Sequence, residues 1–144
     1  PDAITAVTKT LLDSADPSVM ASNAYVPFSD TSDVIDSNNV KVVLSAQGRA
    51  LFYSRQPIPY PKSGATAYLR QLGLYAFRKS GLQLFAEHDP GPVELAEGVE
   101  MLRFLEYGYQ VQMVEVQDDS IPVDTESDLE RVRALLERSE AAAR

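Results

Sequence analysis

The chain has 144 residues, of which 44% are hydrophobic and 24% charged, and its formal net charge is −8. This composition suits one globular domain over residues 1–144, and the negative charge argues against nonspecific binding to nucleic acid or anionic membranes. The absence of cysteine and the single histidine exclude disulfides, thiolate metal sites and multi-histidine metal sites within one chain. No apolar run approaches the roughly 20 residues of a membrane span, and no signal peptide is visible, so a cytoplasmic location is expected.

The first half of the chain predicts one helix and three strands. Apolar residues at helical spacing predict a helix over residues 3–12. Residues 19–28 favour a strand that ends at Pro27, and the polar residues 29–38 favour a loop with one helical turn near Val34. Residues 40–44 and 50–53 flank a turn containing Gly48, which is typical of an antiparallel hairpin. The proline-rich residues 54–62 exclude a helix or a central strand.

The second half alternates helices and strands. Residues 69–77 predict a strand, in which Gly73 allows close approach by a ligand or a neighbouring element. Helices are predicted over residues 82–88, from Pro92 to Gly108, and from Thr125 to about residue 141, with a strand over residues 110–116. The interleaved pattern predicts the α/β class, with a mixed sheet flanked by helices and a protruding β-hairpin.

Asp124 is the first candidate for chemistry. It follows a predicted strand, whereas the next helix already has its own start signal in Thr125 and Asp128. Asp124 is therefore either a second helix-capping acid or a ligand for Mg²⁺, which prefers hard oxygen donors. As a metal ligand it would need a partner carboxylate.

Other candidates lie on the predicted strands and helices. Arg55 is either a solvated side chain or a planar fork that grips a carboxylate or phosphate. Gln71 and Tyr75 share one strand face, which suits either a ligand-facing surface or a core tyrosine. Three acids recur at three-residue spacing, which is usually a solvated stripe, although one of them could accept a hydrogen bond from a sugar hydroxyl: Glu94, Glu97 and Glu100.

Four segments together resemble one enzyme family. In order they are VKVVLSAQGRALFYSRQPIPYP, LRQLGLYAFR, GPVELAEGVEMLRFLEYG and VDTESDLERVR. They are similar to the 3-deoxy-manno-octulosonate cytidylyltransferases, also called CMP-KDO synthetases, over nearly the whole chain. Family members are longer, and the resemblance is to their later part. It implies the C-terminal part of a nucleotide-diphospho-sugar transferase-like (Rossmann-like) fold.

The resemblance also implies a reaction, a cofactor and partners. Family members transfer CMP from CTP to the sugar acid KDO and release pyrophosphate, which activates a lipopolysaccharide precursor. They use Mg²⁺ and are homodimers, and we expect the hairpin of residues 40–53 at that interface because it exposes apolar side chains.

Site residues carry over by motif. Asp124 matches the family's metal ligand, Arg55 matches the arginine that holds the sugar acid, and Tyr75 and Glu100 match positions that line the sugar pocket. Gln71 stands where the family commonly has histidine, and Met101 stands where glutamine commonly follows the pocket glutamate. A changed pocket group can alter selectivity, so the substrate is expected to be KDO or a related sugar acid.

The activity of this chain alone is a separate question. We expect no turnover of CTP, because the family's triphosphate-binding loop and its other metal carboxylate have no counterpart in these residues. The alternative is a non-catalytic module that binds a sugar acid or dimerises. A structural domain with no ligand predicts instead that Arg55, Tyr75 and Glu100 do not converge.

Overall fold

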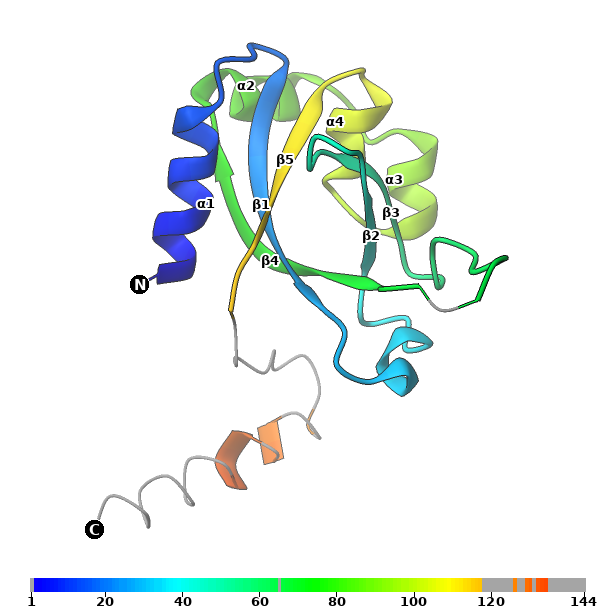
Figure 1. Cartoon of the computed structure of the whole chain (residues 1–144). Helices are drawn as coiled ribbons and strands as arrows, with labels where there is room; N and C mark the ends of the chain where they lie inside the picture. The colour runs from blue at the N-terminus through cyan, green and yellow to red at the C-terminus, as the bar shows by residue number, and fades with distance from the viewer. Residues whose placement is uncertain (1, 65, 118–125, 127–128, 131, 135–144) are drawn as a thin grey trace, which may run out of the picture.

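The computed structural model describes residues 2–64, 66–117, 126, 129–130 and 132–134. Its elements, in chain order, are α1 (Asp2–Asp13), β1 (Val19–Pro27), a 3-10 turn η1 (Thr31–Val34), β2 (Lys41–Leu44), β3 (Ala50–Ser54), β4 (Leu69–Phe77), α2 (Lys79–Glu87), α3 (Pro92–Glu97), α4 (Leu102–Glu106) and β5 (Gln110–Glu115). Figure 1 shows the strands as one curved layer, with α1 on one face and α2, α3 and α4 on the other.

The sheet is mixed, as the sequence predicts. Its strand order is β3-β2-β4-β1-β5, in which β1 and β5 are parallel and every other neighbouring pair is antiparallel. The interior strand β1 is buried on both faces, which explains why its sequence lacks a clean alternation of polar and apolar residues. β2 meets β4 at a single registered pair, Lys41 and Arg70.

Two hydrophobic cores hold the layers together. The larger core lies between the sheet and the α2–α4 side and includes Tyr53, Phe104 and Val111, all fully buried. The smaller core lies under α1, where Val7 packs against Ala24 and neighbouring strand residues. Because successive strand residues point to opposite faces, odd-numbered β4 residues face the larger core and even-numbered ones face α1.

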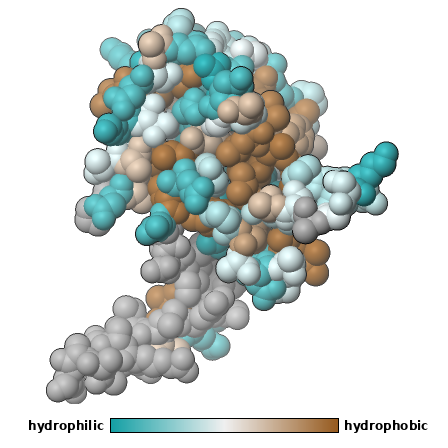
Figure 2. Space-filling view, in the orientation of Figure 1, coloured by the Kyte–Doolittle hydropathy of each residue, from teal (hydrophilic) through white to brown (hydrophobic). Residues whose placement is uncertain are grey.

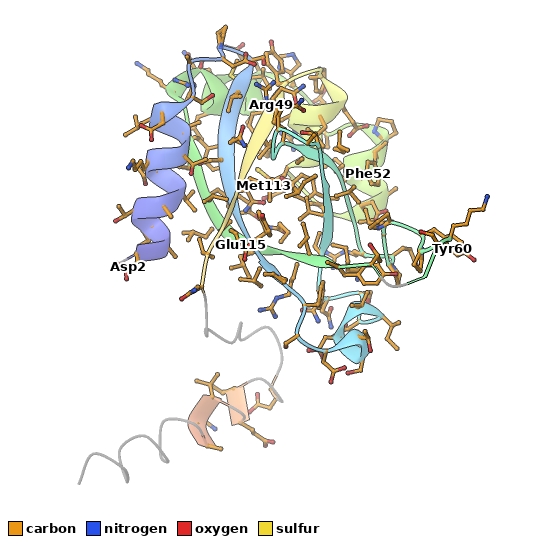
Figure 3. The ribbon with its side chains drawn as sticks, viewed as in Figure 1. Asp2, Arg49, Phe52, Tyr60, Met113 and Glu115 are labelled. Atoms are coloured by element: carbon orange, nitrogen blue, oxygen red, sulfur yellow. The ribbon has the colours of Figure 1, made fainter. Side chains whose placement is uncertain are left out.

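The β2–β3 hairpin is confirmed, and its tip is attached to β5. Gly48 has a φ of 71°, and its carbonyl accepts from the Met113 backbone N–H at 2.9 Å. Arg49 forms an isolated bridge with Gln112 and its Nη2 contacts Asp16 Oδ2 at 2.7 Å. Figure 3 labels Arg49 and Phe52 on the hairpin and Met113 on β5, and Phe52 is 38% exposed.

Two predicted helices have different bounds. α2 begins at Lys79 and not at residue 82. Its first three residues, Lys79, Ser80 and Gly81, carry no large apolar side chain, so the apolar pattern does not reveal them. The predicted helix from Pro92 to Gly108 is wrong as one element. It divides into α3 and α4 at Gly98, whose φ of 61° and ψ of 40° place it in the left-handed region that ends helices.

The sequence predicts a terminal helix from Thr125 to about residue 141, directly after Asp124. Most of residues 125–141, and Asp124 itself, lie outside the described residues. Within the described part of the chain, no helix has the length and apolarity needed to cross a membrane.

Candidate functional site on strand β4

Strand β4 contains a bulge at its centre. Along the β1–β4 ladder, Asn23 pairs with Tyr75 and Tyr25 pairs with Gln71, so β4 spans four residues where β1 spans two. The extra residues interrupt the ladder and free the carbonyls of Leu72 and Leu74. Both carbonyls accept from Asn23 Nδ2, at 2.8 and 3.0 Å.

The bulge coincides with Gly73, which is exposed. A Cβ built at Gly73 would meet nothing within 4 Å. The sequence predicts that Gly73 allows close approach by either a ligand or a neighbouring element. No described element lies close to it, so the second expectation is wrong. The open space lies on the same strand face as Gln71 and Tyr75, and it remains available to a ligand.

Gln71 and Tyr75 are in direct contact beside this glycine. Four residues of a regular strand span about 13 Å, so a contact between side chains at this separation depends on how the strand bends. Here Gln71 Nε2 donates to Tyr75 Oη at 2.6 Å and to the Leu72 carbonyl at 2.6 Å. The Tyr75 oxygen accepts this bond, which leaves its own O–H free to donate elsewhere.

Tyr75 has an altered acidity. Burial raises its pKa above the usual value, the hydrogen bond from Gln71 lowers it, and the negative charge of Glu100 raises it. The phenol is therefore protonated at neutral pH. Glu100 lies outside β4, after the end of α3, and is itself exposed.

Arg55 holds the turn that carries Glu100. Its Nε donates to the Glu97 carbonyl, the last of α3, at 2.7 Å, and its Nη2 donates to the carbonyl of the C-cap residue Gly98 at 3.3 Å. Its Nη1 donates to the Ser37 carbonyl at 2.8 Å. A guanidinium has five N–H donors, so two have no partner among the described residues. Arg55 is therefore not the fully solvated side chain of the first alternative, and its guanidinium still has N–H donors for a ligand.

Sequence reasoning missed a charged partner of Arg55, Glu97, and a buried lysine whose pKa Arg55 affects. The Glu97 carboxylate accepts from Ser54 Oγ at 2.7 Å and from the Arg55 backbone N–H at 2.8 Å. Lys41 is fully buried, and its Nζ donates to the carbonyls of Asp36 and Asn39 at 3.0 and 2.6 Å. Burial lowers the pKa of Lys41, with a further lowering from the positive charge of Arg55. Nothing in a VKVVL strand signals a buried lysine.

The expected acidic stripe is also wrong, because the chain turns at Gly98. Glu94 is 6% exposed and pairs in bidentate fashion with Arg103, at 2.6 and 2.7 Å. Glu97 binds Ser54 and Arg55, and only Glu100 is exposed. Met101, expected near the sugar, is 2% exposed and packs in the larger core.

The predicted site residues are thus distributed unevenly. Gln71 and Tyr75 touch, the charge of Glu100 acts on Tyr75, and Arg55 is hydrogen-bonded to the α3–α4 turn. Asp124 lies outside the described residues. Within the part of the chain that the structure describes, no group of three His, Cys, Asp or Glu side chains could hold a metal ion.

Comparison with known proteins gives a consistent result. A family model for cytidylyltransferases matches residues 1–137. The 3-deoxy-manno-octulosonate cytidylyltransferase of Polynucleobacter asymbioticus is 43% identical over 142 residues, which cover 94% of this chain and 55% of the relative. The enzyme of the same description from Christiangramia forsetii is 43% identical over 112 residues, covering 76% of this chain and 45% of the relative.

A solved structure is also similar. It is CMP:2-keto-3-deoxy-manno-octonic acid synthetase in complex with CTP, with a TM-score of 0.82 and 31% identity, covering 92% of this chain and 54% of that one. The mixed sheet flanked by helices therefore has a nucleotide-sugar transferase-like fold. Within that class, the chain belongs to the cytidylyltransferase family. It spans about half the length of the curated relatives it matches.

Proposed function

We propose that this chain is the sugar-acid-binding part of a cytidylyltransferase that transfers CMP from CTP to a 3-deoxy sugar acid such as KDO. Such a reaction releases pyrophosphate and activates a lipopolysaccharide precursor. The observation that carries the proposal is the Gln71–Tyr75 contact beside the open space at Gly73, in a chain of this family.

The polar groups around this space suit a hydroxylated acid. Tyr75 is protonated at neutral pH and its O–H is free to donate to a sugar oxygen. Glu100 is an exposed carboxylate that can accept from a sugar hydroxyl. The two unpartnered N–H groups of Arg55 can take the sugar carboxylate, and the bonds from Arg55 to Glu97 and Gly98 fix the guanidinium in advance.

In the proposed reaction, the anomeric hydroxyl of the sugar acid attacks the α-phosphorus of CTP. A new oxygen–phosphorus bond forms, the bond to pyrophosphate breaks, and the hydroxyl proton is lost. The residues of this chain contribute by orienting the sugar, since phosphoryl transfer depends mainly on positioning and charge stabilisation.

A divalent metal, which we propose to be Mg²⁺, would neutralise charge on the phosphates. We assign Asp124 as one ligand because a carboxylate is a hard oxygen donor of the kind Mg²⁺ prefers. The described residues offer no metal-binding cluster of their own, so we place the remaining ligands on the nucleotide or outside these residues.

We also propose a homodimer that uses the β2–β3 hairpin. Leu51 is 58% exposed and Phe52 is 38% exposed on the edge strand β3. Figure 2 shows hydrophobic side chains gathered over this part of the surface. An edge strand with exposed apolar side chains favours pairing with a second copy.

Isothermal titration of KDO into the 144-residue chain tests the sugar-binding proposal. We expect saturable binding that weakens about tenfold in Tyr75→Phe, because the lost hydroxyl serves a buried hydrogen bond. Tyr60→Phe is the matched control, since Tyr60 is 85% exposed on the loop after β3 (Figure 3). No binding of KDO, or equal loss in both variants, would overturn the proposal.

Pyrophosphate release with CTP, KDO and Mg²⁺ tests whether the 144-residue chain is active alone. The chain alone is expected to bind KDO without turnover. Turnover would mean that a nucleotide site is assembled from these residues, which would contradict the expectation that they contain no counterpart of the family's nucleotide loop.

A further inference from the structure

We propose that Asn23 is a positioning residue for the Gln71–Tyr75 pair and thereby for the sugar acid. The assignment of the ligand rests on the function proposed above, whereas the effect on the pair does not. Asn23 lies in strand β1, next to β4, and touches neither Gln71 nor Tyr75 through a side-chain hydrogen bond. It acts through the backbone of β4.

The link between these residues is one shared carbonyl. The Leu72 oxygen accepts from Asn23 Nδ2 at 2.8 Å and from Gln71 Nε2 at 2.6 Å. The second hydrogen of the Asn23 amide goes to the Leu74 carbonyl, on the other side of Gly73, at 3.0 Å. One amide therefore holds both ends of the bulge, and the carbonyl that it orients also orients Gln71 against Tyr75.

The environment of Asn23 shows how specialised this position is. The residue is fully buried, and its Oδ1 has no hydrogen-bond partner among the described residues. A buried acceptor without a partner is costly, and asparagine is depleted in strands. The hydrogen bonds from the Asn23 amide offset these two costs. Without them, the carbonyls of Leu72 and Leu74 would have no partner in the β1–β4 ladder.

Ser22 provides a matched control on the adjacent position. It is also fully buried in β1, but it faces α1, where its Oγ donates to the Val7 carbonyl at 2.7 Å. Removing either side chain removes hydrogen bonds of a fully buried residue in the same strand: one for Ser22 and two for Asn23. Only the Asn23 substitution reaches β4 at the bulge, so a general loss of stability and a specific loss of positioning can be separated.

The test uses NMR of the whole 144-residue chain. In Asn23→Leu, which keeps the branched shape and the number of side-chain heavy atoms but has no donor, we expect the Gln71 side-chain amide signals to move toward those of a free amide. The pKa of Tyr75 should rise further, because the hydrogen bond that lowers it is lost. In Ser22→Ala both signals should stay at their wild-type values. If Asn23→Leu does not fold, Asn23→Ser, which keeps one donor, should show the same changes at reduced size.

Binding of KDO gives the second readout. We expect about tenfold weaker binding in Asn23→Leu, the effect of losing one oriented hydrogen-bond partner, and unchanged binding in Ser22→Ala. A folded Asn23 variant with wild-type Gln71 and Tyr75 signals would overturn the positioning role. If wild type fails to bind KDO while the Asn23 signals change as expected, the proposed ligand is wrong and the coupling between Asn23 and the pair stands.

Discussion

Substitution of Arg103 by methionine should destabilise the fold strongly. Arg103 joins three helices: it pairs with Glu94 of α3, its Nη1 donates to the carbonyls of Phe85 and His88 at 2.8 and 3.2 Å, and it belongs to α4 itself. Its guanidinium also lies 3.7 Å from the centroid of the Phe85 ring. The helices it joins include those that flank the turn bearing Glu100.

The magnitude follows from burial of the ion pair. The Arg103 and Glu94 side chains are 10% and 7% exposed. Removing one partner of such a pair leaves a buried charge without compensation, which typically costs about 3–5 kcal/mol. For a domain near this size, 1 kcal/mol lowers the melting temperature by about 3 °C, so we expect a drop of roughly 10 °C. Urea unfolding monitored by circular dichroism measures the change in free energy directly.

Two further variants test whether burial of the Glu94–Arg103 pair sets the cost of breaking it. The double variant Glu94→Gln with Arg103→Met should be more stable than Arg103→Met alone, because it no longer buries an unpaired charge. Arg49→Met breaks a pair with Asp16 whose side chains are 30% and 35% exposed, and it should cost much less than Arg103→Met. Equal losses for Arg49→Met and Arg103→Met, or no recovery in the double variant, would show that burial of the pair does not set its importance.

Three other predictions concern pH, the helix break and the metal. Hydrogen bonds from Ser18 and then from Arg49 lower the pKa of Asp16 to about 2. Stability from Asp16 is thus present above its unfolded pKa of about 4 and lost as the pH falls toward 2, and Asp16→Asn should flatten acid unfolding curves in that window. Gly98→Ala should cost about 1 kcal/mol in urea unfolding because of the left-handed backbone, and an unchanged midpoint would contradict this. Asp124→Asn should abolish Mg²⁺-dependent turnover in an active longer form while leaving circular dichroism unchanged, and wild-type turnover would remove Asp124 from the metal site.

Much of the fold follows from local patterns in the sequence. The hairpin at Gly48 and the alternating strand β5 are confirmed because turn residues and period-two patterns report local backbone geometry. The break at Gly98 was missed because apolar spacing continues across it, from Val93 to Leu105. A glycine within such a pattern does not by itself show that the backbone turns.

The site was harder to predict because its key contacts depend on the sheet as a whole. The sequence places Gln71 and Tyr75 on one face, but their contact depends on a bulge that a residue in another strand, Asn23, supports. Similarly, Glu94 has the local pattern of a surface acid, and only the packing of α4 brings Arg103 to it. Tertiary partners of this kind leave no signature in a short stretch of sequence.

A crystal structure of the chain with bound KDO tests the sugar-binding site most directly. The sugar acid should contact Tyr75 Oη and Glu100 beside Gly73, with its carboxylate against the two unpartnered N–H groups of Arg55. Density for KDO at a different place, such as the surface pocket lined by Met20, His88 and Tyr109, would contradict the assignment of this face of β4 as the sugar-acid site.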